Sequence, residues 1–179
     1  VVQVLAQKSY PYHDARPQDE EVDGGLILQN GVHALRMVEH VAGVRITGIS
    51  AVQTKLGNPC EGELHMATTM MMRLANGGVA CAIANYLNPR GFGIWGNETL
   101  RIFGTLGMVE ATDGGTRTRL VVGSEDRGPL DTSANAPTYL SRLLASLTGG
   151  PPMPLSLEEE LSPTRWVIRA RESARSPAI

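Results

Sequence analysis

Polar side chains recur at helical spacing in one stretch of the sequence. They are Gln29, His33, Arg36 and His40, at positions i, i+4, i+7 and i+11. At about 100° per residue these four lie within a sector of about 60° on a helix. A neutral imidazole near pH 7 can accept or donate a proton, and a nearby guanidinium lowers its pKa. His33 is therefore a candidate acid–base residue, although spacing alone favours an ordinary solvated helix face.

The segment before this stretch is rich in hydrogen-bonding side chains. Lys8, Tyr10, Tyr12, His13 and Arg16 supply an ammonium, two phenols, an imidazole and a guanidinium. A polyol or sugar needs both donors and acceptors for its hydroxyls, and such a set provides them. The same residues also suit a polar surface loop whose tyrosines cover a sheet edge. Both alternatives stay open on the residues alone.

The sequence indicates neither a metal site nor a dinucleotide site. A pair formed by His33 with His40 or His13 lacks the further ligands that zinc sites carry at fixed spacing. Residues 91–96 spell GxGxxG, but a helix must follow at once to receive a pyrophosphate. Residues 97–103 alternate like a strand instead. We therefore expect no metal, and we expect this match to be coincidental.

Hydrophobic periodicity predicts the elements that position these residues. The predicted strands span residues 1–9, 45–55, 64–74, 79–86, 99–103, 108–111 and 117–122. A polar loop over 10–23 precedes a predicted helix over 24–42, and a second helix is predicted over 139–147. This order predicts an α+β fold with an open, mostly antiparallel β-sheet, arranged as a meander, and helices packed on one face.

A third helix is predicted near the end of the sequence. Ser156 and Glu159 match a capping box, in which each side chain satisfies a backbone N–H of the other residue. We expect Pro163 to end the first turn of this helix or to open a new one after Ser162.

Composition and charge exclude several classes of function. The sequence has 179 residues, the size of a single domain, and 42% of them are hydrophobic, a globular balance. Sixteen basic and eighteen acidic residues give a net charge of −2 without a basic stripe, so we expect no nucleic-acid partner. The longest uncharged stretch, 74–89, is shorter than the ~20 residues of a membrane span. No signal peptide is recognisable. We expect a cytoplasmic protein without membrane contact.

Four segments, in their order, resemble the C-terminal domain of the Gfo/Idh/MocA oxidoreductases, the family of glucose–fructose oxidoreductase and inositol dehydrogenase. Residues 24–35, GGLILQNGVHAL, resemble the family's Gly-Gly-x-Leu-x-Asp-x-Gly-x-His segment. Residues 74–80, 102–110 and 171–175 add LANGGVA, IFGTLGMVE and RESAR. Together these segments are distributed over most of the sequence, from residue 24 to residue 175.

The resemblance implies a two-domain enzyme, of which residues 1–179 form one domain. An N-terminal Rossmann domain would bind NAD or NADP, and we expect this sequence, which lacks it and an initiator Met, to be a fragment. The present domain would provide an open sheet face for homo-oligomer contacts and one wall of a site for a sugar, polyol or related hydroxy compound. His33 would handle the proton with a lysine of a Glu-Lys-Pro motif in the nucleotide domain. Because no Glu-Lys-Pro occurs here, we expect the fragment alone to be inactive.

On the same resemblance we expect a substrate wall of six residues. They are Lys8, Tyr10, Tyr12, Arg16, Gln29 and Arg36. Many family members carry Asp at the positions of Gln29 and Arg36, so the pKa of His33 and the preferred substrate charge would differ here. Arg36 would favour a substrate with a carboxylate or a phosphate.

Two alternatives to an oxidoreductase remain. Some family members use the nicotinamide only transiently to cleave a glycosidic bond, and the chain would then belong to an NAD-dependent glycosidase. The altered Asp positions also suit a non-catalytic binding or assembly module. Net NADH production would favour the oxidoreductase over the glycosidase. An upstream glycine-rich βαβ unit with Glu-Lys-Pro would favour an enzyme over the non-catalytic module.

Overall fold

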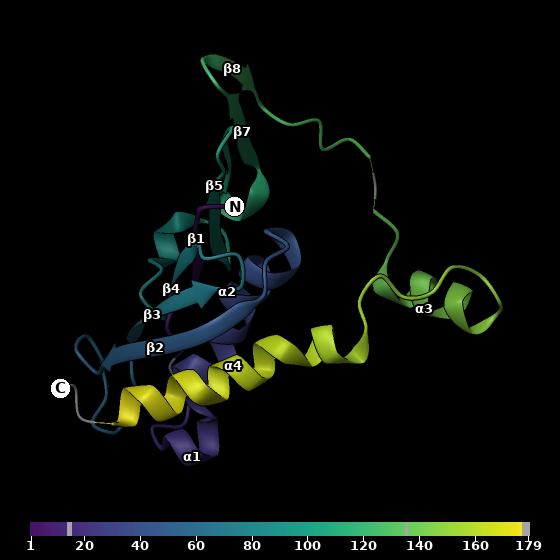
Figure 1. Ribbon diagram of the computed structural model, residues 1–179. Helices are drawn as coiled ribbons and strands as arrows, with labels where there is room; N and C mark the ends of the chain where they lie inside the picture. The colour runs from purple at the N-terminus through teal and green to yellow at the C-terminus, as the bar shows by residue number, and fades with distance from the viewer. Residues whose placement is uncertain (14–15, 135, 177–179) are drawn as a thin grey trace.

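The computed structural model describes residues 1–13, 16–134 and 136–176 and contains one eight-stranded sheet (Figure 1). The strands are β1 Gln3–Ser9, β2 Ile46–Thr54, β3 Ala67–Leu74, β4 Val79–Asn85, β5 Asn97–Phe103, β6 Gly107–Thr112, β7 Arg117–Val122 and β8 Glu125–Gly128. All seven predicted strands are present. The strand predicted over 64–74 begins only at Ala67, because Leu64 and Met66 pack in a separate cluster around Tyr86. The short polar strand β8 has no apolar alternation that could predict it.

The first strand lies in the middle of the sheet. The strand order is β2-β3-β4-β1-β5-β6-β7-β8, and β1 pairs in parallel with β4 but antiparallel with β5. All other neighbouring strands pair antiparallel. The α+β class and the open, mostly antiparallel sheet are confirmed. The expected meander is wrong where β1 separates β4 from β5, because alternation specifies which face of a strand is buried but not which strands flank it.

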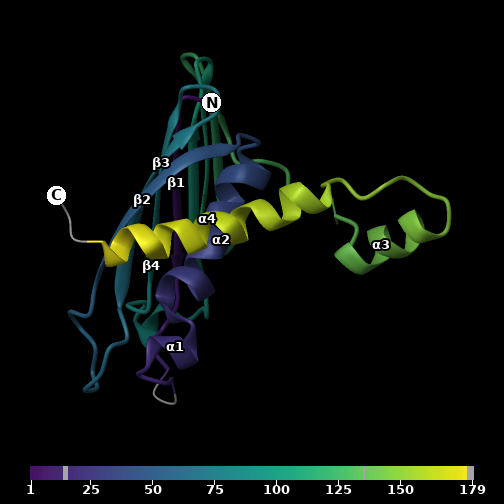
Figure 2. The ribbon, with the colours of Figure 1, turned by 60° about the horizontal axis from the view of Figure 1, so that its bottom comes forward.

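Helices cover one face of the sheet. A continuous helical segment consists of π-helical turns at Ile27–Gly31 and Met37–Val41 on either side of α2, Val32–Arg36. α4, Leu157–Arg175, crosses the same face (Figure 2). Among the described helices, none is long and apolar enough to cross a membrane.

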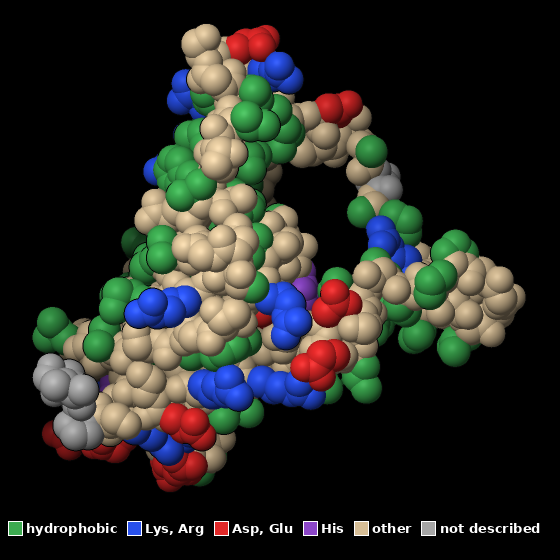
Figure 3. All heavy atoms as spheres, viewed as in Figure 1, with side chains coloured by type: hydrophobic (Ala, Val, Ile, Leu, Met, Phe, Trp, Pro, Cys, Tyr) green, Lys and Arg blue, Asp and Glu red, His purple; other side chains and the backbone are tan. Residues whose placement is uncertain are grey.

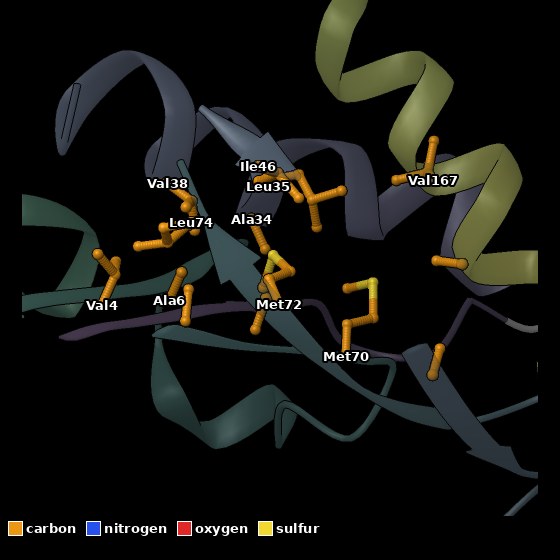
Figure 4. Packing of buried hydrophobic residues seen from close by; sticks show 14 of the residues in the cluster. Val4, Ala6, Ala34, Leu35, Val38, Ile46, Met70, Met72, Leu74 and Val167 are labelled. Atoms are coloured by element: carbon orange, nitrogen blue, oxygen red, sulfur yellow. The ribbon is translucent and has the colours of Figure 1, made fainter. Parts of the chain in front are cut away.

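The main core lies between these helices and the sheet (Figure 4). Leu35 and Val38 come from the helical segment, Met70 and Met72 from β3, and Val167 from α4, and all are buried. Side chains alternate along β3, so the intervening Met71 is exposed on the opposite face. Each buried side chain of this size stabilises the fold by about 1.5–3 kcal/mol.

α4 continues through Pro163, contrary to expectation. Ser156 and Glu159 form the predicted capping box at its start. Because proline has no N–H, the carbonyl of Glu159 lacks its helical donor. His40 donates its Nε2–H to this carbonyl oxygen at 2.9 Å. The helix therefore neither ends nor restarts at Pro163, since a side chain from another helical turn supplies the missing hydrogen bond.

α3, Tyr139–Leu147, lies outside the helical layer on the sheet (Figures 1 and 2). The hydroxyl of Thr138 caps it by accepting from the N–H of Ser141 at 3.1 Å. Its apolar side chains, among them Leu144 and Leu147, are exposed, and Figure 3 shows hydrophobic side chains on its surface. The predicted helix is confirmed, but it contributes little to the core.

The polar segment after β1 ends in a short helix. α1, Glu20–Asp23, is capped by Asp19, whose carboxylate accepts from the N–H of Glu21 at 2.9 Å. The prediction of a loop over all of 10–23 is therefore wrong at its end. This short helix has no apolar periodicity, and it is stabilised instead by its capping residue and by acidic residues near its N-terminus. Residues 14 and 15 of the predicted loop lie outside the described residues.

Truncation of Leu35 tests the packing of the helical layer. We expect Leu35→Ala to lower the free energy of unfolding by about 2–5 kcal/mol, because a fully buried side chain is replaced by a cavity. Urea denaturation followed by circular dichroism measures the change. Leu106→Ala is the matched control, since Leu106 is 80% exposed and should change stability by less than about 0.5 kcal/mol. Equal losses in the two variants would contradict this placement of Leu35.

Candidate active site

Lys8 and Glu98 form a charge pair near the end of β1. The two residues lie opposite each other in the β1–β5 pairing and form an ion pair. Lys8 is only 9% exposed, and its ammonium lies 4.6 Å from the centre of the Tyr10 ring. A charge so far from water needs a compensating partner, which Glu98 supplies. Residue types point to Lys8 and Tyr10 but not to Glu98, because only the strand pairing brings Glu98 there.

His33 lies on an exposed part of α2 within electrostatic reach of Lys8. Partial burial lowers the pKa of His33 below its usual value, and the positive charges of Lys8 and Arg36 lower this pKa further. The imidazole is therefore neutral near pH 7, so one of its ring nitrogens can accept a proton. A small molecule can reach the ring because the side chain is exposed.

Arg16 is the centre of a network that holds the polar segment to the sheet. Its Nη1 donates to Asp23 Oδ1 at 3.0 Å, to Gln29 Oε1 at 2.8 Å and to the Tyr86 hydroxyl at 2.7 Å. Gln29 Nε2 donates in turn to the backbone carbonyl of Asp23. Burial raises the pKa of Tyr86, so its phenol stays neutral and accepts the bond from Arg16. Arg16 and Gln29 are thus brought together, and they bind each other.

The polar stripe of the helical segment is divided among different partners. Gln29 contacts Arg16, whereas Arg36 Nη2 donates to Glu160 Oε2 of α4 at 2.9 Å. His40 contacts α4 as well. The π-helical turns on either side of α2 hold more residues per turn, so the regular 100° spacing does not extend along the segment. The four side chains therefore do not form one uniformly solvated face, since Gln29 bonds the segment after β1 whereas Arg36 and His40 bond α4.

Tyr10, which lies against Lys8, forms an aromatic pair with Trp95, and Trp95 lines a cavity. The ring centres of Tyr10 and Trp95 lie 5.8 Å apart, with the planes tilted by 43°. The cavity measures about 620 Å³ and is lined by Pro11, Tyr12, His13, Arg90, Gly93, Ile94 and Trp95. Gln18 Nε2 donates to the phenolic oxygen of Tyr12 at 2.9 Å. No periodicity marks Trp95, which the turn after β4 brings to Tyr10.

The remaining candidates from the sequence can also be placed. Among the described residues, no group of three or more histidine, cysteine, aspartate or glutamate side chains could hold a metal ion. Residues 91–96 lead into β5, so their GxGxxG match does not open a helix. The interpretation of this match as coincidental is confirmed, because a pyrophosphate would find no helix N-terminus there.

Comparisons with known proteins identify oxidoreductases as the proteins similar to this chain. The family model described as GFO/IDH/MocA C-terminal domain matches residues 1–110. No curated protein sequence matches the chain.

Among solved structures, a proposed oxidoreductase from Thermotoga maritima is 26% identical, with a TM-score of 0.87 over 99% of this chain and 54% of that one. The aldose-aldose oxidoreductase of Caulobacter crescentus, complexed with glycerol, is 18% identical, with a TM-score of 0.77 over 97% and 53%. Levoglucosan dehydrogenase in complex with NADH and L-sorbose is 14% identical, with a TM-score of 0.74 over 97% and 56%. The last two identities show a likeness of fold alone. The chain spans about half the length of these three structures.

Replacement of Lys8 tests its electrostatic link to His33. We expect Lys8→Met to raise the pKa of His33, because the loss of a positive charge, with Glu98 left behind, favours the imidazolium. The Cε1–H chemical shift of His33 in a pH titration by NMR measures this pKa. Lys55→Met is the control, since Lys55 pairs with Glu63 and does not act on His33. The same pKa in the wild type and in Lys8→Met would refute the link.

Proposed function

The chain belongs to the GFO/IDH/MocA family, and on this premise we propose that it is the substrate-binding domain of an NAD(P)-dependent oxidoreductase. Its proposed substrate is a sugar, polyol or related hydroxy compound. The observation that carries the proposal is an exposed His33 kept neutral beside the Lys8–Glu98 pair. A neutral base of this kind, within reach of a small molecule, suits removal of a proton from a hydroxyl group. Sugar-related oxidoreductases of the same fold support the substrate class.

His33 takes the proton in the proposed reaction. Oxidation of an alcohol removes a hydride from carbon and a proton from oxygen. When bound, NAD or NADP would accept the hydride. A ring nitrogen of His33 accepts the hydroxyl proton and passes it to water, which reaches the exposed side chain. In the reverse reaction the imidazolium of His33 returns the proton to the carbonyl oxygen.

Lys8, Tyr10 and Tyr12 line the proposed substrate site with donors and acceptors. The ammonium of Lys8 donates and the carboxylate of Glu98 accepts, so the pair can bind hydroxyl groups in both senses. The Tyr10 ring packs against the Lys8 ammonium and fixes the direction of this side chain.

Arg16, Gln29 and Arg36 complete the proposed wall in a supporting role. Arg16 and Gln29 hold the segment after β1 in place through their mutual hydrogen bond. Glu160 neutralises Arg36, so a substrate carboxylate or phosphate would compete with this pair for the guanidinium. The charge preference expected from Arg36 alone is weakened accordingly.

The cofactor is proposed to bind mainly to a Rossmann domain outside this chain. The GxGxxG match of the chain leads into a strand, so it provides no helix N-terminus that could bind a pyrophosphate. The chain covers only 54% of its Thermotoga maritima relative, which leaves length for such a domain in the whole protein. Residues of that domain would decide between NAD and NADP.

We also propose that the protein forms a homo-oligomer through the open face of its sheet. Val52, Met71 and Val79 are 61%, 63% and 49% exposed on this face, while the neighbouring residues on their strands point into the core. Contiguous exposed apolar side chains mark contact surfaces.

Replacement of His33 in the full-length protein tests the reaction. We expect His33→Gln to lower kcat by about 10²–10⁴-fold and to leave cofactor affinity unchanged, because general base catalysis contributes an effect of that size. NADH absorbance measures turnover, and a fluorescence titration measures cofactor binding. His40→Gln is the control on the same helical segment, because a glutamine can still donate to the Glu159 carbonyl.

The pH profile gives a second readout of the same prediction. Alcohol oxidation should slow as the pH falls through the lowered pKa of His33, because the imidazolium cannot accept a proton.

Unchanged turnover in His33→Gln would remove His33 from the mechanism. Release of free sugar without net NADH would favour an NAD-dependent glycosidase instead, and binding without any turnover would favour a non-catalytic module.

A further inference from the structure

The turn between β4 and β5 exposes three large apolar side chains close together in the sequence. Phe92, Ile94 and Trp95 are 41%, 43% and 63% exposed within four residues of one another. Indole combines a large apolar body with one N–H donor, and tryptophan is enriched at binding surfaces. The indole of Trp95 contacts the ring of Tyr10, with 5.8 Å between ring centres. We call these two rings the aromatic platform.

The cavity beside the platform has the size and the polarity of a carbohydrate subsite. Its volume of about 620 Å³ lies within the usual range for small-molecule sites. Ile94 and Trp95 give it apolar walls, and Tyr12, His13 and Arg90 add hydroxyl, imidazole and guanidinium groups. A sugar ring combines apolar C–H faces with hydroxyls at its rim, so it matches both kinds of wall.

The platform is continuous with the proposed reaction centre. Lys8 acts on His33 through its charge, and the same ammonium lies over the ring of Tyr10. Tyr10 in turn contacts Trp95. Trp95 and its cavity thus lie one side chain beyond the residues that would hold the reacting hydroxyl. A single ring bound between His33 and Lys8 would leave the platform unoccupied.

We propose that the aromatic platform and its cavity bind a second sugar ring, so that the substrate is a disaccharide or a larger glycoside. This inference rests on the proposed function, because it assumes that the reacting ring lies at His33. The second ring stacks one apolar face on Trp95 and directs its hydroxyls toward the polar lining of the cavity. Aromatic pairs gain about 0.5–1.5 kcal/mol from their stacking, and a gain of that size from a sugar face on Trp95 corresponds to an affinity up to about tenfold higher.

Calorimetric titration of the full-length protein tests this subsite. The probes are cellobiose, maltose and lactose, each compared with its component monosaccharides glucose and galactose. At least one disaccharide should bind about tenfold more tightly than its component monosaccharides, and Trp95→Ala should remove this gain while monosaccharide affinity stays unchanged. Trp95→Phe should restore part of the gain, because it keeps an aromatic ring. Leu106→Ala is the control for loss of an exposed apolar side chain.

The outcomes separate this inference from the proposed function. No affinity gain for any disaccharide, or a gain that survives in Trp95→Ala, overturns the second-ring subsite. Dissociation of an oligomer in Trp95→Ala, measured by light scattering, also overturns it, because the platform would then be a protein contact. Disaccharide binding that depends on Trp95, in a protein without NAD(P)-linked turnover, supports the subsite and refutes the oxidoreductase.

Discussion

A lysine that is only 9% exposed is stable when a counter-charge lies beside its ammonium, and in this sheet Glu98 provides that charge for Lys8. The pair forms only if β1 lies directly beside β5, which places the first strand in the middle of the sheet. The charge that is fixed there also favours the neutral form of His33 and packs against Tyr10. The ion pair therefore links the position of β1 in the sheet to the electrostatics of His33 and to the ring of Tyr10.

Local patterns predict most elements of this fold. Alternation locates the seven main strands, and the capping box locates the start of α4, because both signals act within a few residues. The neighbours of β1 are set by pairing between segments distant in sequence, and hydrophobic periodicity carries no information about such pairing. Pro163 shows the same limit, since the donor that compensates for its missing N–H is His40, far away in the sequence. Residue spacing predicts the helices and strands themselves. Long-range contacts determine whether α4 continues past Pro163 and which strands flank β1.

The candidate site also contains residues that the sequence predicts and residues that only the folded structure reveals. Residue types and the family resemblance point to His33, Lys8 and Tyr10, and the structure places Lys8 against Tyr10 and within electrostatic reach of His33. Glu98 and Trp95 could not be predicted, because they join the site only through the pairing of β5 and the turn before it. Arg36 belongs to the predicted polar stripe, yet its partner Glu160 comes from a helix near the end of the chain.

The central position of β1 also shapes how the sheet assembles. β2 to β4 form one ladder between strands adjacent in sequence, and β5 to β8 form another, so each can form from short-range contacts. β1 joins the two ladders, and its Gln3 pairs with both Val79 and Phe103. Contacts over such separations form slowly, because chain entropy is lost before the contact stabilises. During synthesis β1 leaves the ribosome before either partner strand exists. Its apolar side chains Val4 and Ala6 are therefore open to chaperones, and to mispairing with other chains, until β5 has been translated.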